Sequence, residues 1–159
     1  MDMSEILKSN FIRLDLESSC KEDTIKQLID LAFEEGIVLS KEELYKSVME
    51  RETACTTNIM EKIAIPHAKS DAVKQAAVIF GRSDKGIKWC EDDGEDDKVY
   101  LVFLIMVPSA QAGNEHLKIL SVLARCLSHV VFRENLLKAK NKTEINEIID
   151  KQMKVCACN

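Results

Sequence analysis

The stretch "VYLVFLIMVP", residues 99–108, is the feature that most limits how this chain can fold. It contains no charged residue and does not alternate between apolar and polar side chains, so neither face of a strand built from it suits water. Such continuous apolar runs are typical of central strands that are covered on both faces. The run is also too short to cross a bilayer as a helix. It therefore predicts a sheet buried between two layers of helices.

The segments around this run alternate between strand and helix patterns. Strands are expected at 11–17, 62–65, 76–83 and 86–89, and helices at 20–35, 40–52 and, in the final third, 114–131, 132–140 and 143–153. This order predicts an α/β fold, a single-domain sandwich with a mixed central β-sheet flanked by helices.

Capping residues mark the ends of the first two of these helices. Ser19 with Glu22 and Ser40 with Glu43 have the spacing of a capping box, which satisfies backbone N–H groups at a helix N-terminus. Gly36 suits a helix C-terminus because glycine readily adopts a positive φ. Both helices are therefore expected to begin at a serine.

Length and charge narrow the class of protein further. The 159 residues are enough for one domain with a substantial core, which we place at residues 1–152, followed by a flexible tail at 153–159. The net charge of −5 and the lack of a basic block make nucleic acid an unsuitable partner. The N-terminus lacks the apolar segment of a signal peptide, so a cytoplasmic location is expected.

The cysteines and acidic residues do not form a recognisable metal site. None of the six cysteines has a partner at the C-x₂₋₄-C spacing of zinc sites, so reduced structural thiols are expected: Cys20, Cys55, Cys90, Cys126, Cys156 and Cys158. The acidic loop 91–97 lacks the ligand spacing of an EF-hand and is interpreted as a solvated loop. We expect no metal and no other cofactor.

The histidines offer the best candidates for chemistry. In "KIAIPHAKS", residues 62–70, Pro66 should end a buried strand and leave His67 at the edge of the sheet. His116 starts a helix that follows the central strand, and ligands in open α/β sheets bind at such strand ends. His129 lies at the far end of that helix and is expected to be an ordinary hydrogen-bonded residue. Arg51, taken alone, is an ordinary helix-end cation.

Four stretches together resemble one family. "RETACTTNIMEKIAIPHAKS", "FGRSDKGIKW", "VYLVFLIMVP" and "EHLKILSVLAR" are similar to the fructose/mannitol-type IIA domain of the bacterial phosphoenolpyruvate-dependent sugar phosphotransferase system, a family that includes nitrogen-regulatory relatives. The resemblance extends over residues 4–150 and implies a mixed sheet flanked by helices.

The resemblance also implies a function and a site. His67 matches the histidine that accepts the phosphoryl group, and Arg51 and His116 match the two residues that support it. The implied donor is phospho-HPr and the implied acceptor is a IIB domain or protein, with the membrane component IIC involved only indirectly. A neutral imidazole is a nucleophile near pH 7, and an arginine can neutralise the phosphoryl oxygens, so this phosphotransferase chemistry requires no metal.

One departure from the family pattern concerns the loop before His67. The family has three glycines where this chain has Asn58, Met60 and Lys62. Glycines would allow positive φ and a close approach of the backbone to phosphate. We expect the hydroxyls of Thr56 and Thr57 to bind the phosphate in their place.

Two functions are compatible with the same histidine chemistry. The leading hypothesis is a phosphocarrier that serves sugar uptake. The alternative is a regulatory protein whose histidine phosphorylation state controls binding to a partner. The sequence does not indicate which sugar is involved, because sugar choice is expected to depend mainly on IIC.

Overall fold

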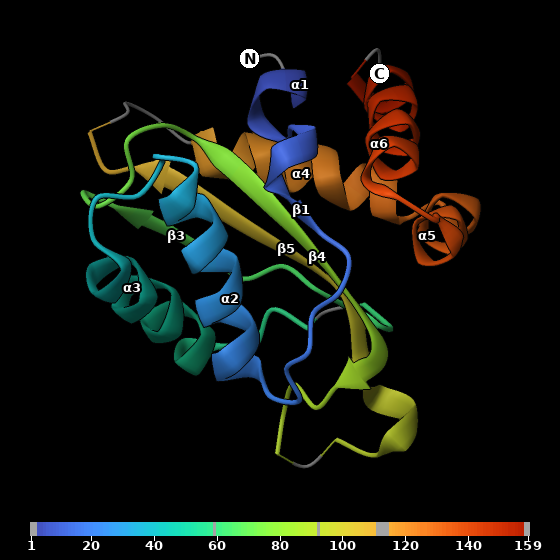
Figure 1. Ribbon diagram of the computed structural model, residues 1–159, viewed down its shortest axis with the longest axis horizontal. Helices are drawn as coiled ribbons and strands as arrows, with labels where there is room; N and C mark the ends of the chain where they lie inside the picture. Colours follow the sequence, from blue (N-terminus) through green and yellow to red (C-terminus); the bar gives the residue numbers. More distant parts are fainter. Residues whose placement is uncertain (1–2, 59, 92, 111–114, 158–159) are drawn as a thin grey trace.

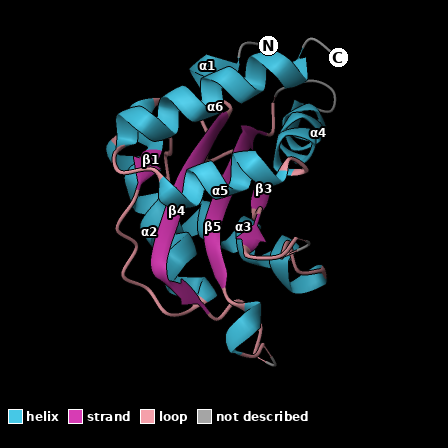
Figure 2. Cartoon of the chain, turned by 90° about the vertical axis from the view of Figure 1, so that its right-hand side faces the viewer, coloured by secondary structure: helices cyan, strands magenta, loops and turns pink. Residues whose placement is uncertain are grey.

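A mixed sheet of five strands forms the centre of the molecule (Figure 2). The computed structural model describes residues 3–58, 60–91, 93–110 and 115–157. From one edge to the other, the strands are β1 (Ile12–Arg13), β4 (Ala77–Ile87), β5 (Val99–Pro108) and an interrupted edge strand formed by β2 (Ile63–Ala64) and β3 (His67–Ser70). β4 and β5 are antiparallel, whereas the other neighbouring pairs are parallel. The predicted mixed α/β fold is confirmed.

The apolar run occupies the central strand, as predicted. Residues 101–107 are at most 1% exposed. Phe103 and Ile105 pack into one hydrophobic cluster, and Val102 and Leu104 pack into another on the opposite face. Because successive side chains of a strand point to opposite faces, a continuous apolar run is what two covered faces require.

Helices cover both faces (Figure 1). One layer consists of α2 (Lys21–Glu34) and α3 (Lys41–Ala54), and the other of α1 (Met3–Ile6), α4 (Glu115–Leu127), α5 (Val130–Lys138) and α6 (Lys142–Ala157). Two short 3₁₀ helices, η1 (Ser9–Phe11) and η2 (Glu95–Asp97), lie in the connections. Within the described residues, no helix is long and apolar enough to span a bilayer.

Two of the three predicted helix caps are present in the structure. The Ser40 hydroxyl accepts a hydrogen bond from the Glu43 N–H at 3.2 Å, and Gly36 has a φ of 78° just after α2. The capping box at Ser19 and Glu22 is wrong, because α2 begins one residue later, with Cys20 at the N-cap and no side-chain cap bond. The hydroxyl of Thr24 instead bonds the Cys20 carbonyl and the Ser18 hydroxyl inside the protein.

Two other elements differ from the sequence expectation. The strand expected at 11–17 pairs only at Ile12 and Arg13, opposite Phe80 and Gly81. The flexible tail expected from residue 153 is largely helical, because α6 runs to Ala157. Met153 and Cys156 are 6% and 3% exposed and belong to the core, so helix packing continues past the expected boundary.

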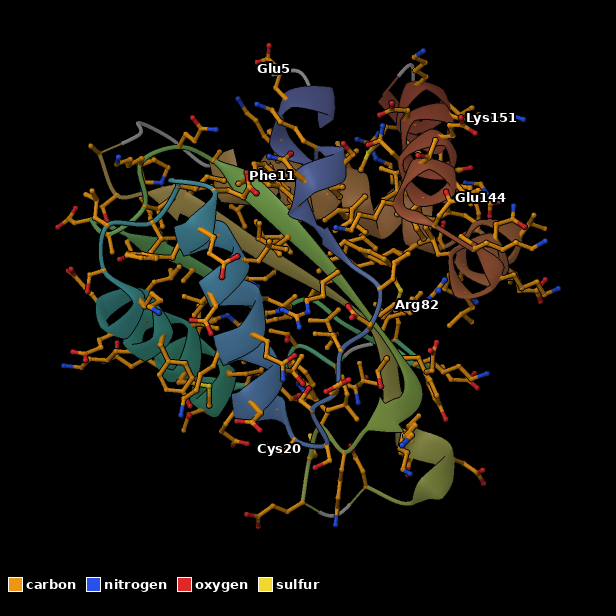
Figure 3. The ribbon with its side chains drawn as sticks, viewed as in Figure 1. Glu5, Phe11, Cys20, Arg82, Glu144 and Lys151 are labelled. Atoms are coloured by element: carbon orange, nitrogen blue, oxygen red, sulfur yellow. The ribbon has the colours of Figure 1, made fainter. Side chains whose placement is uncertain are left out.

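A buried arginine connects the sheet to the second helix layer (Figure 3). The Nη1 of Arg82, on β4, donates hydrogen bonds to the carbonyls of Leu136 at 2.9 Å and Ala139 at 2.6 Å. The last carbonyls of a helix have no partner within the helix, and a cation near the C-terminus interacts favourably with the helix dipole. Arg82 therefore terminates α5 and holds it against β4.

Candidate phosphoryl-transfer site

The edge strand brings His67 to the surface of the sheet. The pairing with β5 is interrupted at Pro66, between β2 and β3, but the Pro66 carbonyl still accepts the N–H of Ile105 at 2.9 Å. The sheet then resumes, with His67 opposite Ile105 on β5. The expectation that the strand ends at Pro66 is therefore wrong in part, since His67 begins a second strand along the same edge.

Two hydrogen bonds to described residues indicate the tautomer of the His67 ring. Its Nδ1 lies 2.9 Å from the carbonyl of Ile65, which can only accept, so Nδ1 carries the proton. Its Nε2 accepts the Nε–H of Arg51 at 3.1 Å. In a neutral imidazole only one nitrogen is protonated, so the lone pair is on Nε2. The nitrogen with the lone pair thus faces the arginine.

Arg51 reaches His67 from the last turn of α3. Its Nη1 donates to the carbonyl of Cys55 at 2.7 Å, at the C-cap of the helix. This second bond fixes the guanidinium plane beside the ring, and a cation at this end of a helix is favourable. Arg51 and His67, sixteen residues apart in the sequence, are therefore in direct contact.

Glu52, next to Arg51, is a residue that the sequence patterns did not single out. It is 3% exposed, and its carboxylate accepts hydrogen bonds from the N–H and the hydroxyl of Thr57 and from Nε1–H of Trp89. The sequence spacing does indicate that Glu52 is buried, because it continues the four-residue spacing of Leu44 and Val48. These three are the buried residues of α3. A glutamate on the buried stripe of a helix requires internal donors.

The loop between α3 and β2 is shaped by one unusual backbone angle. Lys62 has a φ of 68° and is the only non-glycine residue with a positive φ in the part of the chain that the structure describes. It occupies one of the three positions at which the family pattern has glycine. The N–H of Asn58 donates to the Thr56 hydroxyl at 3.2 Å, which closes the other end of the loop.

A cavity of about 530 Å³ opens beside His67. Arg51, Thr57 and Ile65 form one side, and α4 supplies the opposite wall, through Leu117, Leu120, Ser121 and Ala124. Both α3 and α4 contact β3 (Figure 2). Nε2 of His67 and the Arg51 guanidinium therefore lie at an open cavity whose far wall is mostly apolar.

The remaining predicted site residues lie at different places. Thr57 lines the cavity, but its hydroxyl and N–H are both bonded to Glu52. Thr56 lines a neighbouring cavity of about 610 Å³, and its hydroxyl also contacts the Cys90 thiol. His116 is in the first turn of α4, next to Leu117 of the cavity wall, and its side chain lies outside the described residues.

The sequence matches a family model along most of its length. Residues 5–152 match the model for the phosphoenolpyruvate-dependent sugar phosphotransferase system, EIIA 2. The chain belongs to this family. It is an EIIA component of the fructose/mannitol type, and EIIA components are phosphotransfer proteins of the sugar phosphotransferase system.

Similar proteins support this assignment in sequence and in structure. The fructose-specific EIIA component of Haloferax volcanii is 40% identical over 149 residues, covering 93% of this EIIA chain and 94% of the relative. The nitrogen regulatory protein IIA-Ntr of Neisseria meningitidis is 31% identical with a TM-score of 0.81, covering 92% and 98% of the two chains. The mannitol IIA of Escherichia coli is 25% identical with a TM-score of 0.76, covering 89% and 97%.

Proposed function

We propose that this EIIA component carries a phosphoryl group on Nε2 of His67, accepting it from phospho-HPr and passing it to a IIB component in the cytoplasm. The observation that carries the proposal is the pair of bonds on the ring, with Nδ1–H on the Ile65 carbonyl and Nε2 beside Arg51. We place the whole activity in this single domain, whose last helix runs to Ala157.

The proposed transfer is a direct displacement at phosphorus. The Nε2 lone pair of His67 attacks, the P–N bond to the donor histidine breaks, and the donor nitrogen keeps the electron pair. The guanidinium of Arg51 moves from Nε2 to the phosphoryl oxygens, where a planar fork of N–H donors suits two oxygens at once. Charge stabilisation of this kind is the main contribution of a protein to phosphoryl transfer.

The supporting roles of His116, Thr56 and Thr57 are part of the same proposal. The position of His116 in the first turn of α4, beside Leu117 of the cavity wall, supports its role as a second donor to the phosphoryl oxygens. Thr57 lines the cavity and would have to release the Glu52 carboxylate before its hydroxyl binds phosphate. For Thr56 the same role requires its hydroxyl to turn away from Cys90.

A fused relative supports a IIB component as the acceptor. The fructose-specific EIIABC component of Bacillus subtilis is 34% identical over 154 residues. The match includes 97% of this chain but only 24% of the relative, which is much longer. The name of this relative indicates that A, B and C units are joined in one polypeptide, and this chain is similar to one part of it. We expect this chain to serve a IIB unit in the same way.

The experiment is phosphorylation in a purified system with phosphoenolpyruvate, enzyme I and HPr. The wild-type protein should gain one acid-labile, base-stable phosphoryl group, and His67→Ala should gain none. His129→Ala is the matched control, because His129 is exposed before α5, and it should behave as the wild type does. Phosphorylation of His67→Ala at the wild-type rate would contradict the proposal.

A regulatory role is the second candidate. It is favoured by the 31% identity to the nitrogen regulatory protein IIA-Ntr, whereas the 40% identity to a fructose-specific EIIA component favours transport. The two roles differ in the step after phosphorylation. Transfer from phospho-His67 to the IIB protein of a fructose system supports transport, and phosphorylation without any such transfer supports regulation.

A further inference from the structure

We propose that Glu52 is a positioning residue for this site, which holds His67 in the tautomer that reacts. The inference rests on the proposed function of His67. Through Thr57 and Ile65, the buried carboxylate of Glu52 is connected to Nδ1 of the imidazole, on the side of the ring opposite to the attacking nitrogen.

The Glu52 carboxylate is an acceptor surrounded by neutral donors. The Thr57 N–H lies 3.2 Å and 3.1 Å from its two oxygens, the Thr57 hydroxyl donates to Oε1, and Nε1–H of Trp89 donates to Oε2 at 3.3 Å. An ionised carboxylate accepts at both oxygens and is costly to bury without such donors. This arrangement ties the loop at Thr57 firmly to α3.

The connection continues from Thr57 to the histidine through the backbone. The carbonyl of Thr57 accepts the N–H of Ile65 at 3.2 Å. The carbonyl of Ile65 then accepts Nδ1–H of His67 at 2.9 Å. The Ile65 carbonyl that selects the tautomer is therefore held in place by a peptide unit that Glu52 anchors.

Neighbouring residues of α3 thus control both nitrogens of one ring. Arg51 contacts Nε2 directly, and Glu52 acts on Nδ1 through Thr57 and Ile65. If the Ile65 carbonyl shifts, Nδ1 loses its acceptor and the proton can move to Nε2. A protonated Nε2 in a neutral ring has no lone pair for phosphorus, so the fraction of protein in the wrong tautomer is inactive.

The primary test is Glu52→Gln in the full chain. Glutamine keeps the size of the side chain, but its NH₂ group must replace one of the two oxygens that accept hydrogen bonds from Thr57 and Trp89, so at least one of these donors loses its acceptor. We expect the His67 ring of the variant to populate both tautomers, measured from the ¹⁵N shifts of the imidazole at a pH where the ring is neutral. We expect the rate constant for phosphoryl acceptance to fall about 10–100-fold, as for a small misplacement of a reacting group, while KM for phospho-HPr is unchanged because Glu52 is buried.

Glu50→Gln is the matched control. It is the same chemical change in the same helix, two residues away, at an exposed position. Its tautomer and rates should equal those of the wild type. A cooperative urea unfolding transition, followed by the fluorescence of Trp89, the only tryptophan, reports whether each variant keeps a folded core, because this side chain is 2% exposed.

Two substitutions at Thr57 separate positioning from folding. Thr57→Val removes the hydroxyl donor to Glu52 and should also yield both tautomers, whereas Thr57→Ser keeps both donors and should keep the Nδ1–H tautomer. If Glu52→Gln does not fold, Thr57→Val decides the question.

The outcomes separate this inference from the proposed function. A folded Glu52→Gln protein with the wild-type tautomer and rate overturns the inference, and so does an unchanged tautomer in Thr57→Val. If the wild type accepts no phosphoryl group, the proposed function fails. A tautomer change in Glu52→Gln would still support the positioning of His67 by Glu52, because that measurement involves no phosphate.

Discussion

The backbone at Lys62 is strained in a way that glycine would relieve. A φ of 68° lies in the left-handed region, which costs an L-residue about 1–2 kcal/mol because Cβ approaches the carbonyl oxygen. Glycine at this exposed position would remove the clash but would add about 0.4–1 kcal/mol of freedom to the unfolded chain. We therefore expect Lys62→Gly to raise the free energy of unfolding by about 0.5–1 kcal/mol, measured by urea denaturation.

The neighbouring residue is the control for this substitution. Glu61 is also exposed but does not have a positive φ, so Glu61→Gly should lower the free energy of unfolding by about 0.4–1 kcal/mol. Lys62→Asn should fall between wild type and Lys62→Gly, since asparagine tolerates this region. Equal destabilisation by both glycine substitutions would show that the turn adapts to any residue.

Individual site residues were predictable to different degrees. The resemblance implied that Arg51 and His67 belong to one site, and in the structure Arg51 Nε lies 3.1 Å from His67 Nε2. It did not reveal which ring nitrogen has the lone pair, because that depends on the Ile65 carbonyl, which accepts Nδ1–H at 2.9 Å. Glu52 was missed although it lies on the buried stripe of α3, because a charged residue there is buried only when the fold supplies internal donors, here Thr57 and Trp89.

At the scale of elements, local sequence signals predicted helices and the central strand well, but they predicted poorly how far a strand pairs with its neighbour. Periodicity indicated α2 and α3, Gly36 marked the end of the first and Ser40 the start of the second, and the apolar run indicated β5, because these signals depend on neighbouring residues. The alternation in 11–17 was real, but only Ile12 and Arg13 pair with β4. Strand length is decided by a partner almost seventy residues away, which a local pattern does not contain.

Arg82 offers a test of how α5 is held. Substitution by methionine keeps a long apolar stem but leaves the carbonyls of Leu136 and Ala139 without this donor. Hydrogen bonds from a charged donor are worth about 1.5–3 kcal/mol, so we expect Arg82→Met to lower the free energy of unfolding by about that amount. Arg125→Met, at an exposed position of α4, should change it by less than about 0.5 kcal/mol. Similar values for the two variants would show that Arg82 does not hold α5.

The contact between α4 and α6 predicts a difference in thiol reactivity. Burial, together with a hydrogen bond with the Cys156 thiol, raises the pKa of Cys126 to about 12. Only about one Cys126 side chain in ten thousand is then a thiolate at pH 8, and the thiolate is the form that reacts. Cys55 is exposed at the end of α3.

We expect iodoacetamide at pH 8 to modify Cys126 at least about 100-fold more slowly than Cys55, as measured by peptide mass spectrometry. In denaturant the two rates should become similar. Equal rates in the native protein would mean that the α4–α6 contact opens readily.

At the scale of the whole molecule, the site exists because the two helix layers meet at one edge of the sheet. α3 belongs to one layer and α4 to the other, and both contact β3. The interrupted edge strand leaves His67 between them, with Arg51 on one side and the apolar wall of α4 on the other. The sequence predicted the layers, but their meeting at β3 depends on the strand order, which places the β2–β3 edge beside β5.

Among the described residues, the α4 wall of this cavity offers few polar groups, which argues against recognition of the sugar by this chain. Sugar sites need several polar groups to bond hydroxyls, and most of the α4 wall is Leu117, Leu120 and Ala124, with Leu117 50% exposed. Such a surface suits the apolar part of a protein partner that brings its phosphoryl group to His67.

We expect calorimetry to detect no binding of fructose or mannitol to the wild-type chain at millimolar concentrations, with or without phosphorylation. His67→Ala, which enlarges the cavity without adding polar groups, should also bind neither sugar. Saturable binding of a hexose or hexitol that is lost on substitution of Ser121 or Arg51 would place sugar recognition in this chain.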